Sequence, residues 1–449
     1  MKVSLEEILK ACKADLLQNN CECEDEFEIL TDTRKIKGAE IYLPLKGENF
    51  NGEDFCQNAI DTGAIGCFVT RDEFPKNAKI VLKVENTLIA YLEMTKLIRE
   101  KYSPKVIAIT GSSGKTTTKE MVYSVISEQF RAVKTFSNHN NEIGLCQTIF
   151  DIDKNTEVVI VEMGMRGLGE IELLSKYAQP DFAIITNVGT AHLGRLGSVE
   201  NIAKAKCEIT SGLNPNGTVI LHNNDRIRQH INFVGNKKYY SISEVIILEQ
   251  SPNYAKFIYK NNEFELSIGG EYNIENALAA IEIGLELEID IKKIQKGLYK
   301  YRPIEKRWEI KEVSGYKIIN DSYNANPESM MASVSAFLDL YKNDCAIVLG
   351  DMGELGENSK QLHYDVGTFL ANKVKKTNVN NVKFITIGNL AREIAISLVN
   401  SSVEVISFDK VEDATCYIVE NLYIGTTIFL KASRAMRFEA IIEYLEGEK

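Results

Sequence analysis

The most constraining feature of the sequence is an apolar run that ends in a glycine-rich turn carrying a lysine. Residues Val106–Thr110 are typical of a buried strand, residues 111–116 read GSSGKT, and a helical pattern follows. In this context backbone N–H groups converge on an anion, and the helix N-terminus adds a favourable dipole. We therefore predict a phosphate-binding loop in which Lys115 reaches the β- and γ-phosphates of a nucleotide and the Thr116 hydroxyl holds Mg²⁺.

The loop is shorter than the common G-x-x-x-x-G-K-[ST] pattern, whose first glycine would fall on Ile109. A glycine-rich turn with a solvated lysine is therefore the alternative interpretation. The preceding apolar strand, the two glycines and the threonines that follow Lys115 favour phosphate binding.

The whole chain alternates between short apolar runs and helical patterns, as expected of an α/β protein. Its 449 residues suggest three domains of roughly 150 residues each. Continuous apolar runs separated by helices predict parallel sheets covered on both faces. We predict a smaller N-terminal α/β domain over residues 1–85, a central domain with a P-loop ATPase-like parallel sheet over residues 86–312, and a C-terminal Rossmann-like, doubly wound domain over residues 313–449.

Two local predictions concern segments outside this alternation. Residues 1–17 have acidic residues inside an apolar pattern, which predicts an amphipathic helix and argues against a signal peptide. Residues 236–268 consist of shorter alternating runs with little helical pattern, and we predict an antiparallel flap there.

Composition excludes several classes of protein. With 52 Lys and Arg against 63 Asp and Glu, the net charge is −11, which argues against broad nucleic-acid binding. Nine cysteines scattered over so long a chain indicate a reducing compartment and not a disulfide framework. No apolar run approaches the roughly 18 residues that a membrane helix needs. We therefore expect a cytoplasmic monomer that acts on small molecules, with no nucleic-acid partner and no membrane span.

Two candidate metal ligands follow later strands of the predicted central sheet. Glu162 ends the apolar run Val158–Glu162, and His192 comes shortly after the run Phe182–Thr186. The carboxyl ends of parallel strands meet at one edge of a sheet, so both side chains should face the phosphate loop. A carboxylate suits Mg²⁺, whereas imidazole is a softer ligand than Mg²⁺ normally takes. An ordinary strand-end acid and a structural histidine are the alternatives.

Lys206 lies on the apolar side of its predicted helix, whereas Lys204 points to the opposite side. At 100° per residue, Lys206 falls within the arc that comprises Val199, Ile202, Ala203, Ile209 and Leu213. Such a lysine either lays its stem along the helix edge or holds a desolvated amine with a lowered pKa. A desolvated amine can take up CO₂ as a carbamate, which turns a cation into an oxygen ligand for a hard metal.

Together these motifs resemble those of the Mur ligase family, in the order that the family has them. The resemblance covers nearly the whole chain. Within the family, the C-terminal motifs are most similar to those of the member that joins D-alanyl-D-alanine to a UDP-muramoyl tripeptide. The matching segments are the phosphate loop, NHNNEIG (138–144), VEMG (161–164), NVGTAHLG (187–194), AKAKCEI (203–209), NDSYNANPESM (320–330), VLGDMGELG (348–356) and KASR (431–434).

The resemblance implies a role for each matching residue, with Lys115, His192 and Lys206 catalytic. ATP would be bound by Gly111, Ser112, Ser113, Gly114, Lys115, Thr116, Thr117, Asn273, Asn276, Arg307 and Asp321. Mg²⁺ would be held by Thr116, Glu162, His192 and Lys206, the last matching a lysine that many members carry as a carbamate. The UDP-linked peptide and the incoming dipeptide would be bound by Thr33, Arg34, Lys46, Asn140, Asn141, Asn324, Asn326, Asp351, Lys431 and Arg434. The family usually has His at the position of Tyr272, which receives no role.

Several of these positions have structural alternatives. Asn326-Pro327 is a good helix start, Asp321 could cap a turn, and Lys431 with Arg434 could be a solvated basic pair.

The activity implied by the resemblance is ATP-dependent amide ligation in peptidoglycan precursor synthesis. UDP-N-acetylmuramoyl-tripeptide and D-Ala-D-Ala would give the pentapeptide, ADP and phosphate through an acyl phosphate. Whether the third residue of the tripeptide is lysine or diaminopimelate stays open. The alternatives are another Mur-type or a folylpolyglutamate-type ligase, and a P-loop regulatory protein. The regulatory protein would need neither large extra domains nor a lysine on a buried helix face.

Overall fold

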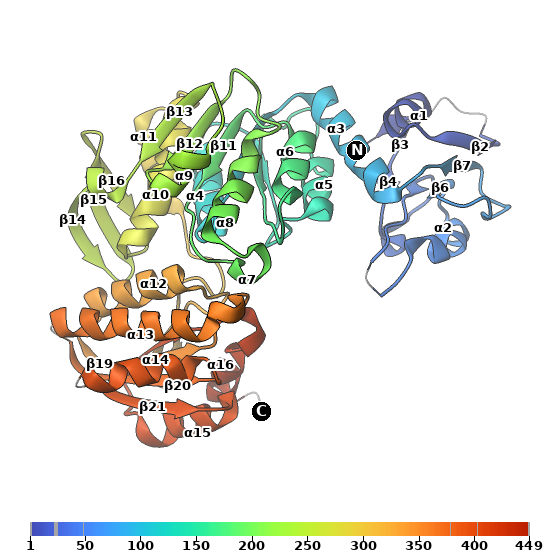
Figure 1. Ribbon diagram of the computed structural model, residues 1–449. Coiled ribbons are helices and arrows are strands. Elements are labelled where there is room, and N and C mark those ends of the chain that lie inside the picture. The colour runs from blue at the N-terminus through green and yellow to red at the C-terminus, as the bar shows by residue number, and fades with distance from the viewer. Residues whose placement is uncertain (1, 22–25, 48, 378, 402, 448–449) are drawn as a thin grey trace.

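The computed structural model describes residues 2–21, 26–47, 49–377, 379–401 and 403–447. Three units, each built around its own sheet, follow one another along the chain and are coloured blue, green to yellow, and orange to red in Figure 1. No helix in the described ranges is both long and apolar enough to cross a bilayer.

The N-terminal unit is built on a five-stranded sheet with a short separate strand pair. Its elements are β1 (Val3–Ser4), α1 (Leu5–Cys12), β2 (Asp15–Asn19), β3 (Glu26–Phe27), β4 (Ile29–Leu30), β5 (Ile41–Tyr42), α2 (Cys56–Thr62), β6 (Gly66–Val69), β7 (Ile80–Lys83) and α3 (Thr87–Tyr102). The sheet order is β2-β7-β6-β5-β4, antiparallel between β2 and β7 and parallel elsewhere. Because α3 contacts α1 as well as helices of the next unit, it joins the two.

The helix predicted over residues 1–17 is wrong in its extent. α1 begins at a capping box in which Ser4 and Glu7 satisfy each other's backbone N–H groups. It ends at Cys12 because Lys13 adopts the left-handed conformation, with φ of 51°. The following segment, Asp15–Asn19, is a strand paired with β7. Short apolar patterns suit both helix and strand, and here the pairing partner decides.

The central unit is built on a six-stranded, all-parallel sheet in the order β13-β12-β11-β8-β10-β9. Its strands are β8 (Lys105–Thr110), β9 (Ala132–Lys134), β10 (Val158–Glu162), β11 (Phe182–Ile185), β12 (Thr218–His222) and β13 (Asn236–Tyr240). Its helices are α4 (Lys115–Ile126), α5 (Glu142–Phe150), α6 (Glu170–Ala178), α7 (Leu193–Leu196), α8 (Val199–Cys207), α9 (Asp225–His230), α10 (Glu271–Glu286) and α11 (Ile291–Lys300).

Both faces of this sheet are buried, which explains the continuous apolar runs of its strands. Ile107 and Ile109 of β8 pack with α4, α10 and α11 on one face, and Val106 and Ala108 pack with α5, α6 and α8 on the other. β8 lies between β10 and β11, so the residues that follow β8 emerge where the chain direction across the sheet reverses. Ligands of open α/β sheets bind at such a point.

The flap predicted over residues 236–268 is partly wrong. Its first strand, β13, joins the parallel sheet beside β12. The remaining three strands, β14 (Ile246–Ser251), β15 (Tyr254–Tyr259) and β16 (Asn262–Leu266), form the antiparallel sheet that the sequence predicts.

The C-terminal unit is a second doubly wound sheet, in the order β17-β18-β22-β19-β20-β21. Its strands are β17 (Glu309–Val313), β18 (Tyr316–Asn320), β19 (Asn343–Gly350), β20 (Asn380–Ile387), β21 (Glu404–Phe408) and β22 (Thr427–Lys431), parallel except for β17. Its helices are α12 (Pro327–Leu340), α13 (Ser359–Lys376), α14 (Ala391–Leu398), α15 (Val411–Asn421) and α16 (Glu439–Glu446). This sheet begins at Glu309, before the predicted domain boundary at residue 313.

The central and C-terminal units share one apolar core around Trp308. The indole is 1% exposed, lies 6.0 Å from the Tyr272 ring of α10 and 5.8 Å from the Phe429 ring of β22, and donates to the carbonyl of Pro252. The N-terminal unit, in contrast, stands to one side in Figure 1. The central and C-terminal units are therefore packed against each other around the edge at which β8 ends.

Candidate active site

The phosphate loop joins β8 to α4 in a conformation that requires its two glycines. Gly114 has φ of 77° at the N-terminus of α4, and a Cβ atom on Gly111 would collide with the Thr186 side chain. The backbone N–H groups of both loop serines donate to Asn187 Oδ1, at 3.0 and 2.9 Å. The residues that follow β11 therefore brace the loop.

The loop opens into a cleft of about 820 Å³ between the central and C-terminal units. Residues 138–142 and the ends of β10 and β11 form its central-unit walls, and residues 321–333 close it from the C-terminal unit. The structure brings together in its walls the predicted residues Ser112, Ser113, Gly114, Lys115, Thr116, Thr117, Asn140, Asn141, Glu162, His192, Asn273, Asn276, Arg307, Asp321, Asn324, Asn326 and Lys431.

The remaining predicted residues do not line this cleft. They are Gly111 and Lys206 behind its walls, Thr33, Arg34 and Lys46 in the N-terminal unit, and Asp351 and Arg434 in the C-terminal unit.

Asp351 contacts the start of another helix. Its Oδ1 accepts from the N–H groups of Leu390 and Ala391, at 3.0 and 2.7 Å, at the beginning of α14. Its carboxylate is thus engaged in holding the C-terminal unit together.

Two of the structural alternatives are decided by local contacts. Asn326 is the N-cap of α12, with Oδ1 accepting from the Ser329 N–H at 2.8 Å, and its Nδ2 lies 3.5 Å from the Ser112 carbonyl. The interpretation of Lys431 as a solvated residue is wrong, because its side chain is 4% exposed and its amine donates to Asp321 Oδ2 at 2.6 Å. Arg434 is 58% exposed.

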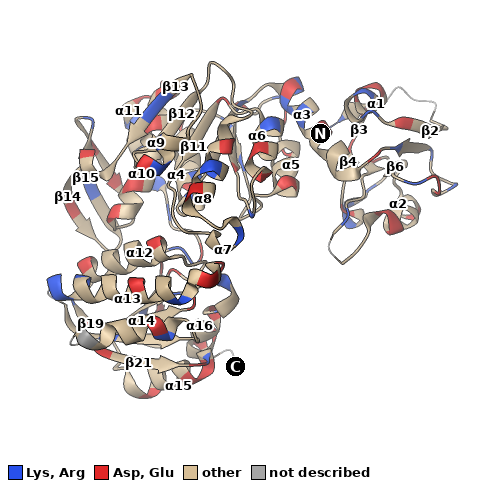
Figure 2. Cartoon of the chain, in the orientation of Figure 1, with Lys and Arg blue, Asp and Glu red and all other residues tan. Residues whose placement is uncertain are grey.

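Arg307 brings a positive charge to the phosphate loop, whereas acidic and basic residues are interspersed on all three units in the view of Figure 2. Arg307 Nη2 donates to Thr116 Oγ1 at 2.9 Å, and its guanidinium lies 4.1 Å from the Tyr323 ring centroid. Arg307 thereby spans from the C-terminal side to the first turn of α4. A cation beside the phosphate loop favours an anionic ligand despite the negative charge of the chain.

Lys115 lies at the start of α4, and its amine donates to the Gly111 carbonyl at 2.8 Å. Burial lowers the pKa of Lys115, while the charge of Glu162 opposes the shift and that of Arg307 adds to it. Among the described residues a single backbone carbonyl accepts from this amine, so one hydrogen bond breaks when the amine turns toward a phosphate.

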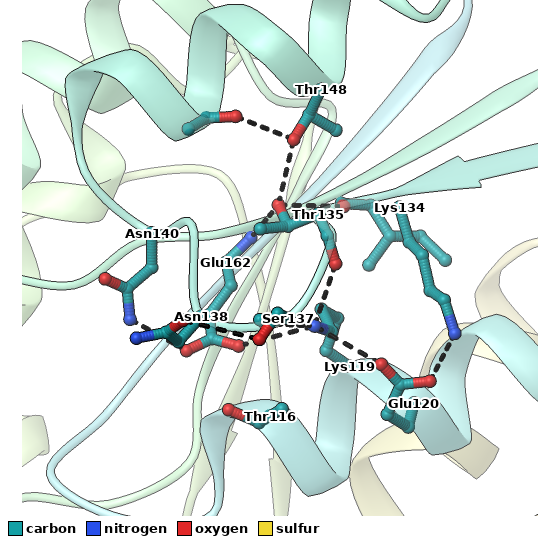
Figure 3. A network of polar contacts seen from close by, with 12 residues as sticks. Thr116, Lys119, Glu120, Lys134, Thr135, Ser137, Asn138, Asn140, Thr148 and Glu162 are labelled. Atoms are coloured by element: carbon teal, nitrogen blue, oxygen red, sulfur yellow. Dashed lines mark hydrogen bonds and ion pairs between the residues drawn. The ribbon is translucent and has the colours of Figure 1, made fainter. Parts of the chain in front are cut away.

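Glu162 ends β10 with a side chain that is 1% exposed (Figure 3). Its Oε1 accepts from Asn140 Nδ2 at 3.0 Å. Its Oε2 is buried without a hydrogen-bond donor among the residues that the structure describes. Buried carboxylate oxygens are rarely left without a partner, so Oε2 is a candidate ligand for a cation.

Lys206 is buried in α8, as the apolar arc predicts, whereas Lys204 is 49% exposed. The Lys206 amine has no hydrogen-bond partner within the described ranges. Burial, and next to it the charge of Lys115, hold the pKa of Lys206 well below its usual value. The neutral amine is the form that reacts with CO₂.

His192 lies at the start of α7 and contacts the C-terminal unit. Its Nδ1 is 2.5 Å from Oε2 of Glu354, and this contact is the main cause that lowers the pKa of Glu354. A metal-binding histidine commonly has a carboxylate on its other ring nitrogen, so a metal would be bound through Nε2.

The described part of the chain contains no group of three or more His, Cys, Asp or Glu side chains that could hold a metal ion. Mg²⁺ is usually bound through one or two carboxylates together with phosphate oxygens and water. The cleft fits that type of site, with Thr116 and Glu162 beside the phosphate loop.

Comparison with known proteins agrees with this geometry. The Mur ligase middle domain matches residues 109–284, and the Mur ligase glutamate ligase domain matches residues 306–434. The UDP-N-acetylmuramoyl-tripeptide--D-alanyl-D-alanine ligase of Bacillus subtilis (strain 168) is 36% identical over 434 residues, which cover 93% of this chain and 92% of the relative.

The chain belongs to the Mur ligase family. Crystal structure I of MurF from Acinetobacter baumannii has 28% sequence identity and a TM-score of 0.88, covering 100% of this Mur ligase and 99% of the other chain. The MurF ligase of Thermotoga maritima in complex with ADP has 26% identity and a TM-score of 0.81, covering 94% and 97%. The three-unit α/β fold predicted from the sequence is confirmed.

Two charged residues near the site of this Mur ligase are not predicted from the sequence. Lys119 is buried in α4 beside Glu162, and a helical wheel like that of Lys206 indicates its burial. Glu328 of α12 accepts from the Thr190 N–H and hydroxyl, at 3.0 and 2.9 Å, and so ties the C-terminal unit to the central one. No local pattern signals that contact, which joins positions 138 residues apart.

Proposed function

We propose that this Mur ligase joins D-Ala-D-Ala to UDP-N-acetylmuramoyl-tripeptide, with conversion of ATP to ADP and phosphate, in peptidoglycan synthesis. The observation that carries the proposal is chain-long similarity to ligases named for that reaction, together with a phosphate loop that opens into a cleft between two units. The B. subtilis relative is named as the D-alanyl-D-alanine ligase, and the T. maritima structure holds ADP.

The reaction must activate a carboxylate, because the anion does not react with an amine at neutral pH. The tripeptide carboxylate attacks the γ-phosphorus of ATP, the bond to the ADP oxygen breaks, and an acyl phosphate results. The amine then attacks the acyl carbon and phosphate leaves. We assign Lys115 and Arg307 to the charge that develops on the transferring phosphoryl group, since both lie at the loop. Contacts between the units, such as that of Glu328 with Thr190, support a role in excluding water from the intermediate.

We assign Mg²⁺ to Thr116, Glu162 and His192, with Lys206 as a carbamate. Among the residues that the structure describes, Oε2 of Glu162 accepts no hydrogen bond and the Lys206 amine has no hydrogen-bond partner, and both observations support this assignment. Carbamate formation joins the Lys206 nitrogen to the carbon of CO₂ and releases one proton. When bound, Mg²⁺ would neutralise the ATP phosphates so that a carboxylate can approach.

We assign the uridine end of the substrate to Thr33, Arg34 and Lys46 in the N-terminal unit, and the incoming amine to the C-terminal unit. Arg34 is 87% exposed, so a ligand can reach its guanidinium from solvent, and it pairs with Asp32 at 2.9 Å. We also propose the cytoplasm as the compartment. Each cysteine that the structure describes is a free thiol, which suits a reducing environment.

Positional oxygen transfer tests the proposed function. Tripeptide labelled with ¹⁸O in its terminal carboxylate should yield labelled phosphate, measured by mass spectrometry, only when D-Ala-D-Ala and ATP are present. Label that stays wholly in the peptide, or release of AMP and pyrophosphate, would contradict the acyl-phosphate route. A control with D-Ala in place of the dipeptide should give little product.

A further inference from the structure

Lys119 is a buried cation that the chemistry above does not use. It lies on α4, one turn beyond Lys115, and its side chain is 0% exposed. A charged amine removed from water is costly unless polar groups replace its hydration. The contacts that replace it therefore show what the residue holds in place.

The Lys119 amine binds the segment that leaves β9. It donates to the carbonyls of Thr135 and Ser137, at 2.8 and 2.9 Å (Figure 3). Residues 138–141, which line the cleft, follow immediately. Lys119 thus fixes the start of a cleft wall to the helix that begins at the phosphate loop.

The same segment positions Glu162. Thr135 Oγ1 accepts from the Glu162 N–H at 3.0 Å, and Asn140 donates to Glu162 Oε1 at 3.0 Å. The Lys119 amine lies 3.7 Å from Glu162 Oε2, an ion-pair distance that forms no hydrogen bond. Glu162 Oε1 accepts a hydrogen bond from Asn140, whereas Oε2 accepts none from the described residues and can therefore bind a second cation.

A nearby carboxylate completes the surroundings of the amine. Glu120 Oε1 lies 3.3 Å from Lys119 Nζ, and Glu120 is in turn paired with Lys134. The Lys119 amine is thus surrounded by two carbonyls and two carboxylates, a set of acceptors that matches its donors.

We propose that Lys119 is a positioning residue, which sets the Glu162 carboxylate and the segment after β9 relative to the phosphate loop so that Glu162 Oε2 and the Thr116 hydroxyl meet one divalent cation. Thr116 lies three residues before Lys119 on the same helix. One turn of α4 therefore carries the proposed metal ligand Thr116 and the lysine that aligns the other ligand, Glu162. The inference rests on the proposed function, since it concerns the nucleotide-bound metal.

Metal binding tests this role without turnover. The dissociation constant of Mn²⁺ from the enzyme–ADP complex is measured by electron paramagnetic resonance, and ADP affinity is measured separately in EDTA. Lys119→Met, which conserves volume, should weaken Mn²⁺ binding by about 10-fold, as loss of an outer partner of a metal ligand typically does. ADP affinity in EDTA should stay unchanged, because the phosphate loop is intact. Lys134→Met is the matched control and should bind Mn²⁺ as wild type does, since Lys134 contacts Glu120 but neither Thr135 nor Glu162 within the described network.

A second comparison removes both charges of the pair, so that the Glu162 carboxylate is not left buried beside a missing cation. Lys119→Met combined with Glu162→Gln removes both charges of the pair, and its Mn²⁺ affinity should equal that of Glu162→Gln alone. A further loss in the double variant would overturn the inference, as would wild-type Mn²⁺ affinity in Lys119→Met. A wild-type ADP complex that binds no Mn²⁺ would instead overturn the proposed function, and this inference with it.

Discussion

Lys119 and Lys206 lie on opposite faces of the central sheet, and both side chains are completely buried. The Lys119 amine donates to two carbonyls beside two carboxylates, whereas the Lys206 amine has no partner among the described residues. A buried amine stays charged where polar groups replace water and loses its proton where they do not. Burial alone therefore does not give a lysine its role, because the groups opposite the amine differ between these two sites.

The largest effect is expected at Lys115, the lysine of the phosphate loop. Lys115→Ala should lower turnover by at least about 10²-fold, because a preorganised charge at the phosphoryl group is lost. The melting temperature should stay close to that of wild type, since the amine has one backbone partner. Turnover is measured by ADP release. More than about a tenth of wild-type activity would contradict the role of Lys115, given the usual size of such contacts.

Substitution of Lys206 tests whether its buried amine acts as a carbamate. Lys206→Ala should lose roughly 10²-fold in turnover, and a short-chain carboxylic acid should restore part of it by supplying the missing oxygens. A ¹³C NMR carbamate signal should appear in wild type supplied with labelled bicarbonate and disappear in the variant. Lys204→Ala is the matched control on the same helix and should change neither, because Lys204 is exposed and pairs with Glu200 at 2.7 Å.

Full activity of the Lys206→Arg variant would contradict the proposed carbamate at Lys206. A guanidinium cannot become an oxygen ligand, so full activity would leave the amine without a chemical role.

Lys431 of the C-terminal unit is a second buried lysine with a carboxylate partner, Asp321. Lys431→Met should lower the free energy of unfolding by about 3 kcal/mol, because it leaves the carboxylate of Asp321 without its buried partner. Lys383→Met, which breaks a more exposed pair with Glu404, should cost less than about 1 kcal/mol. Urea denaturation measures both. Equal costs for the two variants would show that burial does not separate these ion pairs.

The smallest effect is expected at Arg34, an exposed cation of the N-terminal unit. Arg34→Ala should leave the melting temperature unchanged, because its pair with Asp32 is open to solvent. It should raise KM for the UDP-linked tripeptide by about 10-fold, the size of one charge-assisted hydrogen bond, and leave KM for ATP unaltered. Arg71→Ala, at another exposed arginine of the same unit, should change neither KM. An unchanged KM in Arg34→Ala would remove this residue from the substrate site.

The strands of the buried sheets were predictable from the sequence. β10 has the predicted bounds, because a strand covered on both faces appears as an uninterrupted apolar run. Strands whose role depends on a distant partner were not. The predicted N-terminal helix runs into the start of β2, and the predicted domain boundary falls at the end of β17, since pairing with β7 and β18 decides both.

The phosphate loop and the buried face that carries Lys206 follow from local sequence, because strand, glycines and helix are contiguous and periodicity indicates which side of a helix is covered. The groups that contact each buried side chain come from distant segments and depend on how the units pack. Glu354 of the C-terminal unit contacts His192 of the central unit, and Thr135, which follows β9, accepts a hydrogen bond from Lys119 of α4. The physical reason is that a helical wheel reports burial, whereas the charge and chemistry of a buried amine depend on which distant segments pack opposite it.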